Sequence, residues 1–274
     1  MWTTLPRYKT SNNVAYYKIG NGPILFMVHG VGLKLESWTA QLKFFCKKYT
    51  IIAIDLPGHG DSSNLSTIPV NLNSYVQEIK LFTDEVIRTP FFIMGHSLGA
   101  LISISYAHSN SKNCMGIVAL NCIYQRSCES IKEIKLRYKK LASKKMEQEI
   151  NITIDRWFGK KPSSYYSELA NICRQWLHES YKKGYLQAYD VFSNQTGVSK
   201  EILKKINIPI IFITGSLDLN STPLMSKNMA NLCWKGISKE IEGAGHMAHM
   251  SHSKEVNEII NLFTSANKIV NEIE

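Results

Sequence analysis

No stretch of this 274-residue sequence approaches the roughly 18 to 20 consecutive apolar residues that a membrane-spanning helix needs. The segment from Met1 to Asn21 also lacks the charged start and apolar stretch of a secretion signal. Hydrophobic residues make up 44% of the chain and charged residues 20%, which excludes a disordered or fibrous protein. We therefore expect a soluble, cytoplasmic protein with one compact domain, room for an inserted subdomain and no role at a membrane.

Paired cysteines and regular basic stretches are also missing. None of the six cysteines stands in a CxxC pair, so we expect free, mostly buried thiols rather than disulfides. No basic run is interleaved with aromatic residues at a regular spacing, so the net charge of +10 does not predict a nucleic-acid partner. The cysteines are Cys46, Cys114, Cys122, Cys128, Cys173 and Cys233.

Short apolar runs alternate with helical patterns along most of the chain. Such runs are typical of strands in a sheet that is covered on both faces. Helical patterns fill the gaps, for example at 74–87 and 254–269. The alternation predicts an α/β fold with a doubly wound, mostly parallel sheet. The expected strands are Ile24–Val28, Tyr49–Ile54, Phe91–Met94, Gly116–Leu120, Ile208–Ile213 and, more weakly, Lys239–Glu242.

The alternation stops between Cys122 and Lys200, where the chain is Lys-rich and amphipathic. A structureless loop of that length is uncommon inside a compact domain. We therefore predict a helical lid at 122–200, inserted into a core that is formed by 1–121 and 201–274. This segment holds fifteen Lys and Arg and eight Asp and Glu, so it carries seven of the ten net positive charges. We interpret that excess as a solvated helical surface.

The segment Gly95-His96-Ser97-Leu98-Gly99 matches the pattern G-x-S-x-G. It follows an apolar strand and precedes the helical run 100–108. In this setting the serine stands on a sharp strand-to-helix turn that exposes its hydroxyl, and the glycines allow the backbone to approach closely. A bare pentapeptide can match by chance in a glycine-containing turn, but the flanking strand and helix favour Ser97 as a nucleophile.

A serine hydroxyl needs a base that takes its proton during attack. His246 stands in the glycine-rich loop 243–247, after the last expected strand and before the terminal helix. This position gives the chain order Ser, acid, His that is expected of such a turn. Three other histidines, His29, His59 and His96, lie inside turn motifs, and we assign them structural roles.

The base in turn needs a carboxylate that holds its tautomer. Asp218 lies just beyond the expected strand that ends at Ile213, 28 residues before the histidine. Asp55 precedes the serine, Asp84 lies within a predicted helix, and the strand that ends at Leu120 is followed by Asn121 rather than an acid. We therefore predict that Asp218 is the orienting acid.

Two backbone amides should bind the developing oxyanion. One belongs to the residue after the nucleophile, Leu98, and the other to the loop after an early strand. That loop reads His29-Gly30-Val31-Gly32. We choose Val31 as the second donor, with Gly32 as its rival.

At these residues the sequence resembles the lid-bearing branch of the α/β-hydrolase superfamily, which contains 3-oxoadipate enol-lactonases, meta-cleavage product hydrolases, cofactor-free haloperoxidases and small carboxylesterases. The resemblance implies a cofactor-independent serine hydrolase that cleaves a small carboxylic ester or lactone, without a metal. The segment 55–62 resembles a structural turn of the family, and 155–159 resembles the enol-lactonase lid. The other matching segments are 29–30, 95–100, 215–218 and 243–247.

Departures from the subfamilies bear on the reaction. Ser97 excludes the alkyl-enzyme route of haloalkane dehalogenases, whose nucleophile is an aspartate. Meta-cleavage product hydrolases carry serine, glycine and proline where this chain has 31–33, and a tryptophan where it has Met247. Hydrolysis of a carbon–carbon bond is therefore the alternative activity. A catalytically idle small-molecule receptor is a further alternative, which turnover of a short aryl ester would exclude.

Three residue sets remain open at this stage. Trp38, Trp157 and Met247 would suit an apolar substrate group, although core packing explains each of them equally well. His246, His249 and His252 recur at spacing three, but no further ligand completes a metal site. The lid lysines would favour a carboxylate-bearing substrate if their charge attracted it to the mouth of the pocket, but we interpret them as a solvated surface. These are Lys132, Lys135, Lys139, Lys140, Lys144 and Lys145. The sequence does not indicate an oligomeric state.

Overall fold

The computed structural model describes residues 4–143, 146–159, 163–180 and 182–268, so Lys144 and Lys145 lie outside the described residues. Within these ranges eight strands form one sheet in the order β1-β2-β4-β3-β5-β6-β7-β8. Strand β2 runs antiparallel to β1 and β4, and the remaining pairs are parallel. The predicted doubly wound, mostly parallel α/β sheet is confirmed. The strands are β1 (Tyr8–Lys9), β2 (Ala15–Ile19), β3 (Ile24–Val28), β4 (Thr50–Ile54), β5 (Phe91–His96), β6 (Cys114–Leu120), β7 (Ile210–Gly215) and β8 (Gly236–Ile241).

Every predicted strand is present, and the two that the sequence did not predict are β1 and β2. Strand β1 is exposed along its length, and β2, at the edge of the parallel strands, contains two tyrosines and Lys18. Neither strand forms a continuous apolar run, so the pattern that identifies buried parallel strands misses them.

Helices cover both faces of the sheet. Alternate residues of β3 point to opposite faces, so Phe26 and Val28 join one apolar cluster while Leu25 and Met27 join the other. The first face is covered by α2 (Leu72–Val86), α3 (Leu98–Ser109), α8 (Lys200–Lys205) and α9 (Pro223–Ala230). The second is covered by α1 (Thr39–Phe45), α10 (Ala248–Ser251) and α11 (Ser253–Lys268).

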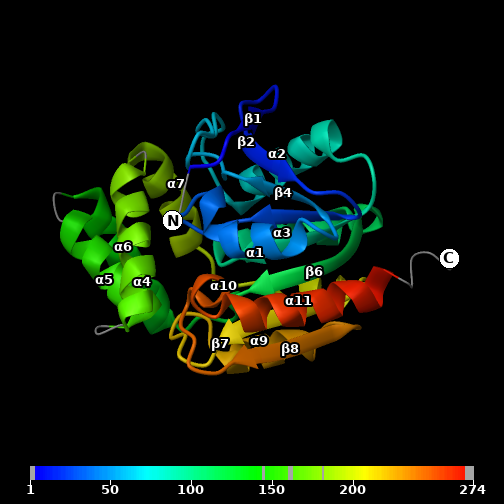
Figure 1. Ribbon diagram of the computed structural model, residues 1–274. Coiled ribbons are helices and arrows are strands. Elements are labelled where there is room, and N and C mark those ends of the chain that lie inside the picture. The colour runs from blue at the N-terminus through cyan, green and yellow to red at the C-terminus, as the bar shows by residue number, and fades with distance from the viewer. Residues whose placement is uncertain (1–3, 144–145, 160–162, 181, 269–274) are drawn as a thin grey trace.

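Four helices lie between β6 and α8, where the lid was predicted. They are α4 (Cys128–Ala142), α5 (Met146–Phe158), α6 (Ser164–Glu179) and α7 (Lys182–Ser193). Their apolar faces form a cluster of their own, which Leu33, Met247 and Met250 of the core complete. Figure 1 shows these helices on the left of the molecule, at the end toward which the arrow of β6 points. The carboxyl ends of the parallel strands therefore face the lid.

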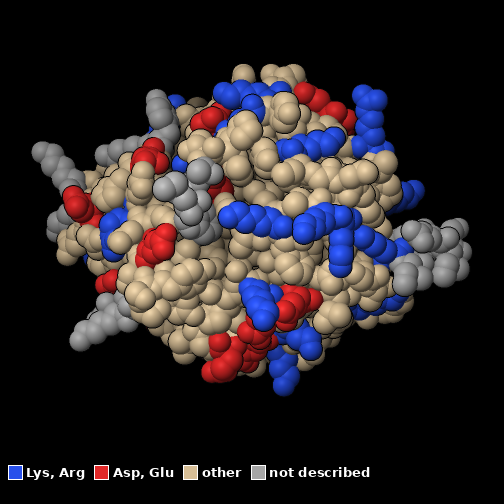
Figure 2. All heavy atoms as spheres, viewed as in Figure 1, with Lys and Arg blue, Asp and Glu red and all other residues tan. Residues whose placement is uncertain are grey.

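One face of the molecule shows how charged side chains are distributed over the core and the lid helices. On the face drawn in Figure 2, Lys and Arg side chains extend mainly over the core rather than over the lid helices on the left. All six cysteines are free thiols, as predicted, and four of them are buried. Among the described residues, no helix combines the length and apolarity required to cross a membrane.

Candidate active site

Ser97 stands on the turn between β5 and α3. Its backbone has φ 56° and ψ −115°. This conformation is energetically unfavourable for any residue that has a side chain. The flanking glycines are required by the same turn, because a Cβ at Gly95 would overlap the carbonyl oxygen of Gly99. A Cβ at Gly99 would overlap the carbonyl oxygen of Val28 in the neighbouring strand. The G-x-S-x-G segment thus forms the sharp strand-to-helix turn that its pattern predicts.

His246 and Asp218 form a buried pair. The Nδ1 atom of His246 lies 2.7 Å from Oδ2 of Asp218, and both side chains are at most 4% exposed. The histidine lies in the loop between β8 and α10, and the aspartate follows β7. Because the aspartate accepts at Nδ1, the Nε2 atom of His246 is the nitrogen left to act on a neighbouring group.

Three further hydrogen bonds hold the Asp218 carboxylate. Oδ2 accepts from Nδ2 of Asn121 at 2.8 Å, and Oδ1 accepts from the amides of Asn220 and Ser221 at 2.8 and 3.2 Å. Burial alone would raise the pKa of Asp218, but the His246 ring and these hydrogen bonds lower it below its ordinary value. The aspartate is therefore ionised at neutral pH in spite of its burial.

Ser97 and His246 line one small cavity, which we call the inner cavity, at the contact between core and lid. Its volume is about 40 Å³, and no hydrogen bond joins the described serine and histidine side chains across it. The other lining residues include Val31 and Asn220 from the core and Arg137, Arg156, Trp157 and Tyr189 from the lid. This volume is little more than the space that one water molecule occupies in the liquid, about 30 Å³.

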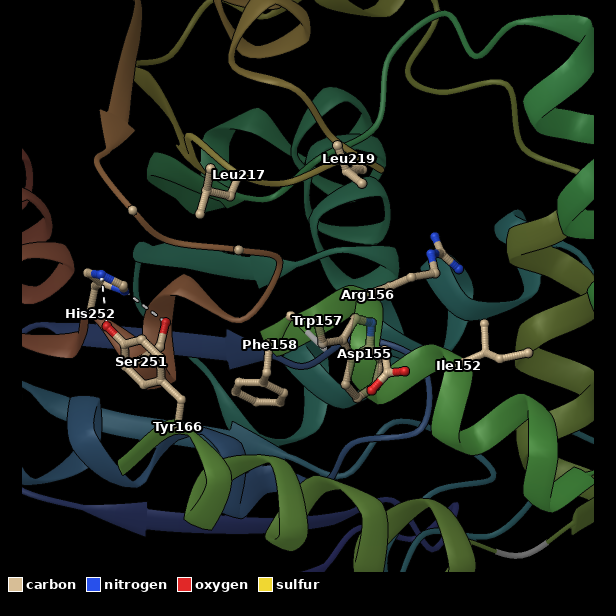
Figure 3. Close-up of a pocket in the computed structure, with 13 residues that line it drawn as sticks. Ile152, Asp155, Arg156, Trp157, Phe158, Tyr166, Leu217, Leu219, Ser251 and His252 are labelled. Carbon is tan, nitrogen blue, oxygen red and sulfur yellow. Dashed lines mark hydrogen bonds between the residues drawn. The ribbon is translucent and has the colours of Figure 1, made fainter. Parts of the chain in front are cut away.

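A second, larger cavity lies beside the first and is called the outer cavity here. Its volume is about 560 Å³, within the range of small-molecule sites. Figure 3 shows α5 on one side, with Arg156, Trp157 and Phe158, and the loop that carries Leu217 and Leu219 on the other. Arg156 and Trp157 line both cavities. The outer cavity contains neither Ser97 nor His246, so its size alone does not make it the reactive centre.

The amide of Gly32 is already engaged. It donates to Nε2 of His59 at 3.0 Å, while Nδ1 of His59 lies 3.2 Å from the carbonyl oxygen of Pro57. The amides of Val31 and Leu98 have no hydrogen-bond partner among the described residues, and Val31 lines the inner cavity. Of the two rivals in this loop, Val31 is therefore the one whose N–H is free to bind an oxyanion.

The remaining histidines serve the surrounding framework. Nε2 of His96 lies 2.9 Å from the carbonyl oxygen of His246, and burial holds the pKa of His96 well below its usual range. His29 receives the amide of Leu56 at Nε2. His249 is fully buried, and His252 contacts the Tyr166 hydroxyl at 3.1 Å. In the part of the chain that the structure describes, no group of three or more His, Cys, Asp or Glu side chains is placed to hold a metal.

The three predicted substrate contacts occupy different surroundings. Trp157 lines both cavities, and its ring centroid lies 6.3 Å from that of His246. Trp38 is fully buried against His249, with ring centroids 4.7 Å apart, and lines neither cavity. Met247 is also fully buried and packs beneath the lid helices. Only Trp157 is in a position to touch a bound molecule in this structure.

Sequence reasoning did not nominate Asn121 or the lid arginines as parts of the site. Asn121 follows β6, and β6 is the neighbour of β7, after which Asp218 comes. Side chains at the carboxyl ends of adjacent parallel strands lie close together, so the strand order would have identified this pair. The sequence pattern of 155–159 resembles a lid segment but does not indicate that Arg156 lines a cavity.

Comparison with known proteins finds relatives that share this fold. The model of the alpha/beta hydrolase family matches residues 25–259. The sequence is 30% identical over 258 residues to the (E)-2-((N-methylformamido)methylene)succinate hydrolase of Acinetobacter baylyi, with 90% of this chain and 93% of that protein covered.

Two solved structures superpose closely on the chain. One is a thermophilic esterase from Thermogutta terrifontis, with 18% identity, a TM-score of 0.85, and coverage of 96% of this chain and 99% of the esterase. The other is the enol-lactonase from Burkholderia xenovorans LB400, with 19% identity, a TM-score of 0.81, and coverage of 95% and 100%. At these identities the likeness shows the fold alone.

Proposed function

This chain belongs to the alpha/beta hydrolase family, and we propose that it hydrolyses a small carboxylic ester or lactone through an acyl-enzyme formed on Ser97. One observation supports this most strongly. Ser97 stands on a strained turn and lines the same small cavity as His246. The Nδ1 atom of His246 lies 2.7 Å from Oδ2 of the buried Asp218 carboxylate. This arrangement supports the assignment of Ser97 as nucleophile, His246 as base and Asp218 as orienting acid.

In the first half of the reaction, Oγ of Ser97 forms a bond to the carbonyl carbon of the substrate. Nε2 of His246 takes the hydroxyl proton, and Asp218 stabilises the imidazolium that results. The bond between the carbonyl carbon and the leaving oxygen then breaks, and the imidazolium returns its proton to the departing alcohol. In a lactone that alcohol stays attached to the acyl group.

In the second half a water molecule replaces the alcohol. His246 takes a proton from the water as its oxygen attacks the acyl carbon, and the proton passes to Ser97 as the acid is released. The amides of Val31 and Leu98 would stabilise the oxyanion in both halves, because neither is engaged within the described structure. No redox cofactor or metal enters any of these steps.

A second candidate is hydrolysis of an amide. The observation that favours it is the 30% identical relative, whose name specifies a formamide-bearing succinate rather than an ester. The same serine, histidine and aspartate can attack an amide carbonyl, because acyl transfer differs only in the leaving nitrogen. The test of the proposed function therefore pairs the ester substrate with its matched amide.

The test replaces Ser97 by Ala and measures hydrolysis of a short neutral aryl ester. The substitution should lower kcat by on the order of 10⁶, by comparison with serine deletions in other triads. Circular dichroism should show an unchanged fold, because the change removes one oxygen. If the wild-type protein turned over no ester or amide, an idle receptor would be the better description. If Ser97→Ala retained more than about a tenth of the wild-type kcat, the assignment of Ser97 as the nucleophile would be refuted.

A further inference from the structure

Two arginine side chains reach the inner cavity from the lid. Arg137 comes from α4 and Arg156 from α5, and both line the cavity together with Ser97 and His246. No Asp or Glu among the described residues lines it. Apart from His246 and the weakly acidic tyrosine hydroxyls, the ionisable groups at the surface of the inner cavity are therefore cationic.

Arg156 has no counter-ion in the described structure. It is half-buried, and it forms neither a hydrogen bond nor an ion pair with any residue that the structure describes. Figure 3 shows the Arg156 guanidinium and the carboxylate of the adjacent Asp155 pointing in different directions. A guanidinium remains protonated at every pH at which proteins are stable, so this charge is permanent.

The charge of Arg137 is only partly balanced. Its Nε atom lies 3.7 Å from Oε2 of Glu149, and Nζ of Lys140 lies 3.5 Å from Oε1 of the same carboxylate. Two cations thus share one buried anion. The Glu149 group holds Arg137 at the cavity wall without cancelling the net positive charge there.

A third guanidinium lies behind the cavity wall. Arg126 is 7% exposed and stacks on the ring of Phe192, a lining residue, at 4.1 Å. Its Nη1 donates to the carbonyl oxygens of Phe192 and Gln195, while its Nη2 is buried and has no partner among the residues that the structure describes. Burial, together with the nearby Arg137, lowers the pKa of Arg126 to about 10, so it is still charged at neutral pH.

We propose that the substrate carries a carboxylate, and that Arg156, assisted by Arg137, binds this carboxylate while Ser97 attacks the carbonyl. This inference rests on the proposed function and adds the substrate class to it. The planar fork of a guanidinium matches a carboxylate with two parallel hydrogen bonds. Because Arg156 lines both cavities, the recognised charge would sit beside a space of about 560 Å³ that accommodates the rest of a small molecule.

Binding of a substrate carboxylate by Arg156 differs from a general attraction of anions by the exposed lysines of the lid. Lys132, Lys135 and Lys139 are exposed on α4, where salt screens their charge within about 10 Å at 0.1 M. The guanidinium of Arg156 would meet the substrate in direct contact, which salt screens much less. A substitution at Arg156 should therefore change the choice of substrate, whereas loss of an exposed lysine should not.

The experiment uses nitrophenyl monoesters of succinic, glutaric and adipic acids, each paired with the neutral ester in which a methyl group replaces the carboxylate. The quantity measured is the ratio of kcat/KM for the charged ester to kcat/KM for its neutral partner. Arg156→Gln should lower this ratio by on the order of 10- to 100-fold for the best chain length, as expected for loss of a hydrogen bond to a charged group. Arg156→Lys should restore part of it.

Lys135→Gln is the matched control, because it removes the same charge from an exposed position of α4. It should leave the ratio unchanged at 0.1 M salt. A ratio for Arg156→Gln within about threefold of wild type would overturn the proposal, since a charged hydrogen bond contributes more than that. If Arg156→Gln failed to fold, the wild-type protein would provide the test. A kcat/KM for every charged ester no higher than that for its neutral partner would also overturn the proposal. Either result leaves the serine mechanism intact, which only Ser97→Ala tests.

Discussion

The side chain of Asn121 hydrogen-bonds the carboxylate of Asp218, and replacing it tests how much this hydrogen bond contributes to stability and to activity. Its Nδ2 donates to the same oxygen of Asp218 that contacts His246. Asn121 also has a positive φ of 49°, which asparagine tolerates better than most residues. We therefore compare Asn121→Gly, which keeps that backbone conformation, with Asn121→Ala, which strains it.

The expected size of the effect follows from the bonds that remain. Asp218 keeps His246 and the amides of Asn220 and Ser221 when the asparagine amide is lost. A hydrogen bond to a charged group contributes about 1.5 to 3 kcal/mol to the free energy of unfolding. For a chain of 274 residues, that corresponds to a decrease in Tm of about 3 to 5 °C. Asn121→Ala should be less stable than Asn121→Gly by about 1 kcal/mol because of its positive φ.

Catalysis should suffer much less than it would from loss of the acid itself. The pKa of Asp218 would rise on loss of the Asn121 bond, but the carboxylate would still be ionised at neutral pH and would still select the tautomer of His246. If about half of the bond's free energy is expressed in the transition state, kcat falls about 4- to 13-fold. Asp218→Asn, in contrast, should lower kcat by roughly 10⁴, as in other triads.

The assay is kcat for a neutral aryl ester at pH 7, together with thermal unfolding of each variant. An Asn121→Gly variant as inactive as Asp218→Asn would show that the histidine depends on the asparagine as much as on the aspartate. An Asn121→Gly variant with unchanged Tm and unchanged kcat would show that the 2.8 Å contact contributes nothing. Either outcome would refute the reasoning above.

Two further predictions concern acid stability and the lid. Because the pKa of Asp218 is lowered in the folded protein, its ionisation stabilises the fold above the ordinary value of about 3.9, and this contribution is lost as the pH falls through the lowered pKa. Urea unfolding between pH 5 and 3 should therefore show a shallower loss of stability in Asp218→Asn than in wild type, and parallel curves would contradict this. A Cβ at Gly245 would lie 2.6 Å from the carbonyl oxygen of Trp157, so Gly245→Ala must push the end of α5 away from the site. We expect about 1 to 3 kcal/mol of destabilisation and a lower kcat/KM, and a variant as active and as stable as wild type would show that this contact adjusts freely.

Local patterns predicted the parts of this molecule that depend on adjacent residues. The strained turn of Ser97 follows from two glycines and a serine between an apolar run and a helix, which are all visible within the segment 91–108. The occupied amide of Gly32 was not predictable in this way, because its partner His59 comes from another turn. The contact of Asn121 with Asp218 needed the order of the strands, which no local pattern contains.

Aromatic residues near the site were equally ambiguous in the sequence. Trp38 and Trp157 are both apolar residues in helical segments, and both suit core packing or a substrate contact. In the structure one is fully buried against a histidine, while the other lines both cavities. The difference arises from the packing of the lid on the core, which brings together segments more than a hundred residues apart.

The charge of the lid illustrates which sequence signal would have been more informative. The excess of seven positive charges is a sum, and it does not distinguish exposed lysines from a guanidinium in a cavity. Position within a helix does distinguish them, because residues three or four apart share a face. Arg137 lies three residues after the buried Ile134 and four before the buried Leu141, whereas Lys135 lies on the exposed side of the same helix. A cation on the buried stripe of an inserted helix is costly to keep unless something pairs with it. Glu149 pairs with Arg137 only in part, and Arg156 has no anionic partner among the described residues. A substrate carboxylate would supply the negative charge that both arginines lack.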